Sequence, residues 1–181
     1  GNYCNKGAIF KDNLPIVKEL IEQQGLELFK YDRLKKTAEY TEEGKKWLAS
    51  KKEIQDLYVI ERTYELIDFD KLAKEKQKEI REKLYIQNVF QQILLALTVY
   101  ERDVDYIVDS GKVKIIDPHT GRVKESNRWE YGLHTAMEVK EEVEVQNDFD
   151  GMAVISLKNY FQLYTKIAGM SGTIMPVEDE L

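Results

Sequence analysis

The chain has 181 residues, enough for one ordinary domain or for one domain with an appendage, and 43% of them are apolar, enough for a packed core. Its formal net charge of −6 argues against a nucleic-acid-binding protein, because affinity for a phosphate backbone needs clustered lysine and arginine. The single cysteine, Cys4, cannot form an internal disulfide, and we find neither a signal peptide nor an apolar run of about 20 residues, so we expect a soluble, cytosolic protein.

The first third of the chain predicts a helix, a hairpin and a second helix. Asn13 is a suitable N-cap for a helix over residues 14–24, with a proline in its first turn and a glycine just after its end. Apolar residues then alternate over residues 26–40, which is typical of a β-hairpin. Thr41 caps a short helix over residues 42–50, whose first turn carries the acidic residues that a helix dipole favours.

The middle of the chain predicts a long helix. Residues 51–69 show no single period, whereas residues 70–100 have helical periodicity. The first half of this segment is nearly all charged and predicts a solvated face, and a break near Leu84 would divide it into two helices. The second half carries an apolar stripe that is wide enough for the core, made of Ile86, Val89, Phe90, Ile93, Leu94 and Leu97.

After Arg102 the apolar period changes to two, which indicates strands. A strand from Val104 to Val108, the turn signal Ser110-Gly111 and a return over residues 112–117 predict a hairpin. Residues 129–140 predict a further helix. Extended segments at Val143, Val145 and residues 152–157 and a last helix over residues 159–168 complete an expected α+β fold.

Two patterns of polar residues suggest chemistry. Asp103, Asp105, Asp117 and His119 have the ligand types of a metal site and leave a small metal-dependent hydrolase open as an alternative, although alternating strand residues are usually solvated. His119 and His134 lack a serine or cysteine nucleophile in a recognisable setting. The sequence contains no phosphate-binding glycine loop of the Walker type. We therefore expect that the chain has no complete site for nucleotide hydrolysis of its own.

Four strings in the second half of the chain carry a family resemblance. They are Arg-Asp-Val-Asp-Tyr-Ile-Val at 102–108, Ile-Asp-Pro-His-Thr-Gly-Arg at 116–122, Arg-Trp-Glu-Tyr-Gly-Leu-His at 128–134, and the run from Asn159 to Thr173. In this order and at these spacings they resemble SecA, the ATP-driven motor of bacterial protein export. The resembling stretch is the preprotein cross-linking domain and its return into the first nucleotide-binding domain. A start at Gly1 instead of methionine agrees with an excised piece of a longer protein.

The resemblance implies a helical bulb with β-hairpins on a two-stranded antiparallel stem. Residues 1–13 would form a tail or the entering stem strand, with Ala8 to Phe10 as its candidate, residues 14–150 the cross-linking-like domain, and residues 151–181 the returning strand and the start of a nucleotide-binding segment. The implied sites are polypeptide pairing at Met152, Ala153, Val154, Ile155, Ser156 and Leu157, clamp-hinge packing at Trp129, Tyr160 and Phe161, and nucleotide coupling at Gly169, Ser171, Gly172 and Thr173.

The function implied by the resemblance is a clamp that holds unfolded preproteins for a motor that couples ATP hydrolysis to export. ATP and Mg²⁺ would belong to the parent protein, and the chain itself would bind neither. Its partners would be an unfolded preprotein and a membrane translocation channel, with no nucleic acid, and it would lie peripherally at the inner face of the cell membrane. A non-catalytic structural adaptor stays open as a further alternative.

Overall fold

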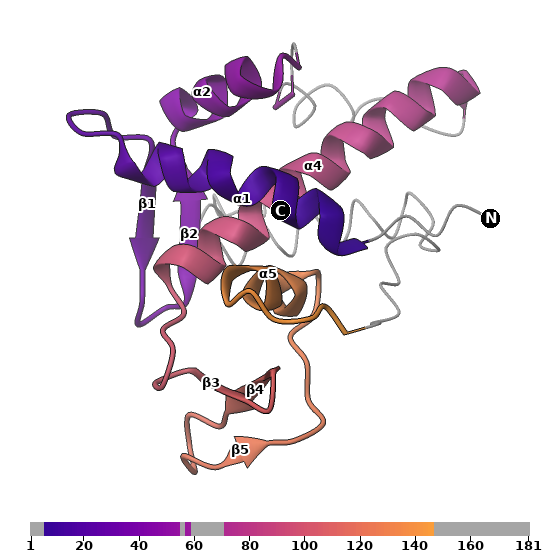
Figure 1. Cartoon of the computed structure of the whole chain (residues 1–181). Helices are drawn as coiled ribbons and strands as arrows, with labels where there is room; N and C mark the ends of the chain where they lie inside the picture. The colour runs from indigo at the N-terminus through magenta and orange to yellow at the C-terminus, as the bar shows by residue number, and fades with distance from the viewer. Residues whose placement is uncertain (1–5, 55–56, 59–70, 147–181) are drawn as a thin grey trace, which may run out of the picture.

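The computed structural model describes residues 6–54, 57–58 and 71–146 and has the expected α+β architecture (Figure 1). Its helices are α1 (Lys6–Glu22), α2 (Glu42–Lys52), α4 (Lys74–Thr98) and α5 (Leu133–Lys140). Its strands are β1 (Phe29–Asp32), β2 (Thr37–Tyr40), β3 (Tyr106–Asp109), β4 (Lys112–Ile116) and β5 (Val123–Lys124). None of the helices in this described part is long and apolar enough to cross a membrane. The expected returning stem strand over residues 152–157 and the helix over residues 159–168 lie outside the described residues.

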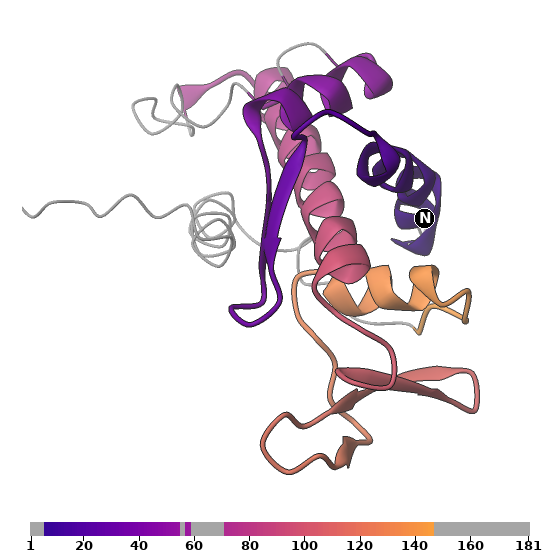
Figure 2. The same cartoon turned by 90° about the vertical axis from the view of Figure 1, so that its left-hand side faces the viewer.

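Helix α4 is the central element of the fold. It runs through the middle of the molecule, with α1 packed across it and α5 against its C-terminal half (Figures 1 and 2). Phe90, Ile93 and Leu94 of α4 are fully buried together with Leu20 of α1 and Met137 of α5. Four residues of the stripe predicted for α4 are therefore confirmed as core, Val89, Phe90, Ile93 and Leu94, whereas Ile86 and Leu97 are only partly buried at its margin. The break near Leu84 that would have divided this helix does not occur, because α4 continues through this residue.

Helix α1 begins earlier than the sequence predicts. It starts at Lys6, so the proposed entering strand over residues 8–10 is wrong, and Asn13 lies inside the helix instead of capping it. Phe10, Asn13, Val17 and Leu20 recur at helical spacing and are each at most 2% exposed, so one buried face extends past the expected start. The Asn13 amide donates to the carbonyl of Ile9 at 2.7 Å, within the turn where the pyrrolidine of Pro15 removes a backbone donor.

The first hairpin is confirmed, and β2 is the strand that contacts α4 most. Strands β1 and β2 pair antiparallel, with Phe29 opposite Tyr40. The Tyr40 hydroxyl donates to the carbonyl of Phe90 at 2.7 Å, and the Gln91 side chain donates to the carbonyl of Ala38 at 2.8 Å. Both contacts reach β2, so β2 lies between α4 and β1, and β1 is the outer strand (Figure 1).

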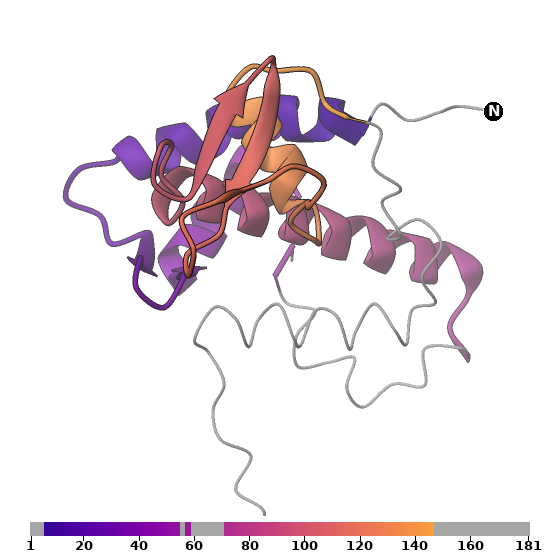
Figure 3. The same cartoon turned by 90° about the horizontal axis from the view of Figure 1, so that it is seen from below.

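The second hairpin forms a three-stranded sheet with β5, and β4 contacts α5 (Figure 3). Its turn at Ser110-Gly111 has φ of +52° and +71°, the left-handed pair of a type I′ hairpin, as predicted. Strand β3 begins at Tyr106 instead of Val104, because Asp105 holds a turn before it. The Asp105 carboxylate accepts from the backbone N–H of Glu101 at 2.8 Å.

Helix α5 is shorter than predicted. It begins at Leu133 instead of Trp129, because Tyr131 and Gly132 have positive φ, +62° and +93°. A Cβ at Gly132 would lie 2.9 Å from the ring of Phe10, so this glycine also lets α1 approach closely. Val143 and Val145 lie in no strand, and the Val143 N–H donates to the Glu138 carbonyl at the end of α5.

Candidate functional site

Trp129 joins three elements of the fold. Its ring centroid lies 5.1 Å from that of Tyr100 after α4, 6.0 Å from that of Tyr106 in β3, and 5.5 Å from that of His134 in α5. Tilted and edge-to-face contacts of this kind stabilise a junction beyond the burial of their area. Trp129 is therefore a packing residue, and its predicted role at a clamp hinge stays a prediction.

A buried polar cluster lies beneath this junction. The backbone N–H of Trp129 points to Nδ1 of His134 at 3.3 Å, so Nδ1 accepts and Nε2 carries the proton that faces the carbonyl of Val113 at 3.2 Å. Glu138, only 1% exposed, binds both terminal nitrogens of Arg128, at 2.7 and 3.3 Å. Because both ring nitrogens of His134 are occupied by backbone groups, the geometry describes a structural histidine and not an acid–base catalyst.

The last residue of α5, Lys140, caps the C-terminal end of α4. The ammonium of Lys140 donates to the carbonyls of Ala96 at 2.8 Å and Tyr100 at 3.1 Å, where the helix leaves carbonyls without intrahelical partners. The next residue, Glu141, accepts from the hydroxyl of Tyr106 and pairs with Arg102 at 3.2 Å. Sequence reasoning missed this cluster, and only the basic last turn of the predicted helix hinted at it.

Alkaline pH is expected to lower the stability of this domain. Burial raises the pKa of Tyr40 well above its usual value and also raises those of Tyr100 and Tyr106, with a contribution from Glu141 at Tyr106. The unfolded chain loses these phenolic protons at about pH 10, while the folded chain keeps them. The free energy of unfolding therefore falls as the pH rises further. Burial lowers the pKa of Lys140, and this shift by itself would make stability rise with pH. The three tyrosines outnumber this one lysine, so we expect a net loss of stability.

The measurement is thermal unfolding between about pH 8 and about pH 11. The melting temperature should fall above about pH 10, and the fall should be less steep for Tyr106→Phe, which removes one of the three phenols. The buried tyrosines would not be the cause if the melting temperature of the unsubstituted chain did not fall at alkaline pH, or if it fell equally steeply for Tyr106→Phe.

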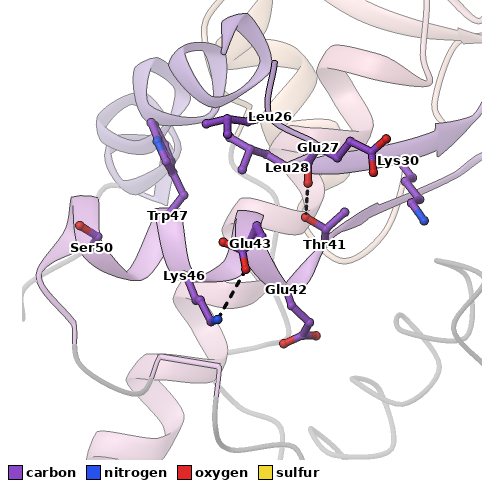
Figure 4. A pocket seen from close by; sticks show the side chains of 10 residues that line it. All are labelled: Leu26, Glu27, Leu28, Lys30, Thr41, Glu42, Glu43, Lys46, Trp47 and Ser50. Carbon is purple, nitrogen blue, oxygen red and sulfur yellow. Dashed lines mark hydrogen bonds and ion pairs between the residues drawn. The ribbon is translucent and has the colours of Figure 1, made fainter. Parts of the chain in front are cut away.

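Two of the hollows on the surface of the described part border residues discussed above. One, with a volume of about 350 Å³, lies beside Trp129 and is also lined by Lys36, Gln91, Tyr100 and Tyr131. The other is a shallow groove with a volume of about 620 Å³ between the segment leading into β1 and helix α2 (Figure 4). Its lining residues are Leu26, Glu27, Leu28, Lys30, Thr41, Glu42, Glu43, Lys46, Trp47 and Ser50.

The groove is held together by the cap of α2. The Thr41 hydroxyl accepts from the Gly44 N–H at 3.1 Å and donates to the Glu27 carbonyl at 2.6 Å, which confirms Thr41 as the predicted N-cap. Lys46 pairs with Glu43 at 3.5 Å across the first turn of the helix. The groove is shallow and open, and it offers a contact surface.

The structure does not support the metal-hydrolase alternative. Within residues 6–54, 57–58 and 71–146, no three histidine, cysteine, aspartate or glutamate side chains gather as a metal site would require. The Asp105 carboxylate binds the ammonium of Lys36 at 2.6 Å, and the Asp117 carboxylate accepts from the backbone N–H of His119 at 2.8 Å. The latter bond is the main cause that lowers the pKa of Asp117. These carboxylates therefore organise turns instead of converging on one point.

Of the site residues predicted from the sequence, Trp129 is the one that the structure describes. The others lie outside the described residues: Met152 to Leu157, Tyr160, Phe161, Gly169, Ser171, Gly172 and Thr173. Their proposed roles stay predictions.

Comparisons with known proteins agree on one family. A family model described as the SecA preprotein cross-linking domain matches residues 5–138. The protein translocase subunit SecA of Salinibacter ruber is 37% identical over 187 residues, covering 80% of this chain and 16% of that protein. The subunit of the same name from Chloroherpeton thalassium is 36% identical over 181 residues, covering 93% of this chain and 17% of that protein. The chain thus spans less than a fifth of the length of these relatives.

Proposed function

Because the chain belongs to the SecA family through its preprotein cross-linking domain, we propose that it is the preprotein-binding part of a SecA-type motor. The observation that carries this proposal is the match of the family model over residues 5–138, most of the chain. In this proposal the parent protein couples ATP hydrolysis to the export of unfolded preproteins through a membrane channel. The chain contributes capture of the preprotein and movement of the clamp.

ATP and Mg²⁺ would be held by parts of the motor outside this chain. The sequence has no phosphate-binding glycine loop with its lysine, and the described residues gather no metal-binding cluster. The motor would work peripherally at the inner face of the cell membrane. The packing around α4 supports this division of labour, because a closely packed domain can move as one body when another part of the protein uses the nucleotide.

Capture is proposed to use backbone pairing at residues 152–157. Main-chain hydrogen bonds do not depend on the side chains of the partner, so one strand can hold many different unfolded polypeptides. Tyr160 and Phe161 would pack with Trp129 at the clamp hinge, and the segment from Gly169 to Thr173 would couple the clamp to the nucleotide state.

The test is binding of an unfolded secretory polypeptide to the 181-residue chain by fluorescence anisotropy. Ile155→Pro should weaken binding by about tenfold, because proline removes a backbone donor from the pairing strand. Ile155→Val keeps the donor and serves as the control, with affinity within about twofold of the parent chain. Equal affinities of the proline and valine variants would contradict pairing at this strand. If the unsubstituted 181-residue chain did not bind the polypeptide, preprotein capture itself would be contradicted.

A further inference from the structure

The outer edge of β1 carries backbone groups without a partner among the described residues. The Thr41 N–H donates to the Leu28 carbonyl at 3.0 Å, so residues 28 and 41 form a hydrogen-bonded pair of the ladder. In an antiparallel ladder such pairs alternate with pairs whose N–H and C=O groups point outward. With Phe29 opposite Tyr40 and Tyr31 opposite Ala38, the outward groups of β1 belong to Phe29 and Tyr31.

The two edges of the hairpin differ. On β2 the outward carbonyl of Ala38 accepts from the Gln91 side chain of α4, which agrees with the alternation derived above. Ala38 and Tyr40 are only 1% and 7% exposed, so this edge is buried. On β1 no hydrogen bond to Phe29 or Tyr31 is made beyond the hairpin within the described part of the chain. Figure 1 shows β1 as the outer strand, with α4 on the side of β2.

The side chains beside this edge suit an extended polypeptide of varied sequence. The rings of Phe29 and Tyr31 stack with centroids 6.1 Å apart and form an apolar shelf on one face, and Tyr31 is 50% exposed. Lys30 lies opposite Glu39, so opposite charges are balanced on the other face. β1 contains neither a proline nor a bulge, two features that commonly block the addition of a strand.

We propose that the outer edge of β1 is a second polypeptide-binding edge, which takes an extended segment of the unfolded cargo as a third strand on the β1–β2 hairpin. The open N–H and C=O groups of Phe29 and Tyr31 call for another extended backbone, and the aromatic shelf accepts alternate apolar side chains of that strand. So few pairing groups give weak, reversible binding, which fits a chain in transit. This inference rests on the proposed function, and it places a contact far in sequence from residues 152–157.

The experiment uses the 181-residue chain and a soluble peptide of alternating valine and threonine. In amide hydrogen exchange, peptide at saturating concentration should slow exchange at Phe29 and Tyr31 and leave Ala38 and Tyr40 unchanged. Tyr31→Pro removes an outward N–H without removing a ladder bond to β2, so it should weaken binding by about fivefold or more. Tyr31→Val keeps that N–H and is the matched control, with a smaller loss.

Unchanged exchange at Phe29 and Tyr31, or equal affinities of Tyr31→Pro and Tyr31→Val, would overturn the inference. The exchange measurement uses the unsubstituted 181-residue chain. It therefore tests whether the peptide pairs with β1 even if the proline variant does not fold. A chain that binds a secretory polypeptide through Ile155 but shows no effect at Tyr31 would retain the proposed function and lose only this second edge.

Discussion

Replacing Gly44 by alanine is expected to lower the free energy of unfolding by about 3 kcal/mol or more. A Cβ at this position would lie 1.9 Å from the carbonyl oxygen of Leu28 and 2.9 Å from its carbonyl carbon. Both atoms are backbone, so either α2 or the segment leading into β1 must shift. The shift would disturb the Thr41 cap, whose bonds to Gly44 and Glu27 hold the same corner.

This expectation is opposite in sign to what helix propensity predicts. Gly44 lies in the first turn of α2, where alanine would ordinarily stabilise a helix by about 1 kcal/mol relative to glycine. Urea unfolding measures the difference. Gly121→Ala is the control, since Gly121 has φ of +68° but nothing within 4 Å of the added Cβ, and a loss of only about 1 kcal/mol is expected there. An alanine at position 44 that stabilises the chain would show that this close approach does not exist.

Removing the charge of Arg128 should be the other large effect. Arg128→Met leaves the carboxylate of Glu138, which is 1% exposed, without the cation that binds it at 2.7 Å. Breaking a buried pair on one side typically costs about 3–5 kcal/mol, because a buried charge is left uncompensated. The side chain of His134 lies 3.8 Å from the same carboxylate, but its proton on Nε2 faces the Val113 carbonyl.

A double-mutant cycle separates this effect from lost packing. Arg128→Met with Glu138→Leu should recover at least about half of the loss in urea unfolding, because no charge then stays buried. The exposed pair Lys78–Glu82, 3.9 Å apart, is the control, and Lys78→Met should change stability by no more than about 0.5 kcal/mol. A double variant that is no more stable than Arg128→Met would assign the loss to packing instead of charge.

Sequence reasoning succeeded where a structural feature depends on neighbouring residues. Thr41 caps α2 and Ser110-Gly111 turns the second hairpin, because each uses hydrogen bonds or φ angles within a few residues. It failed where a distant element decides. Helix α1 begins at Lys6, before the start that the sequence predicts. Its early turn is stabilised by the ring of Phe10, which packs against Gly132, more than 100 residues further along the chain.

The sequence by itself determined the family, the α+β class, both hairpins and the helical stripe that became the core, because these depend on local periodicity, turn chemistry and strings of residues. Only the tertiary structure decided which edge of the first hairpin is buried and which has no hydrogen-bond partner within the described part of the chain. It also decided why Gly44 cannot carry a side chain, and that Arg128 neutralises Glu138. The physical reason is that each of these depends on the distance between atoms of different elements, and local periodicity carries no information about that distance.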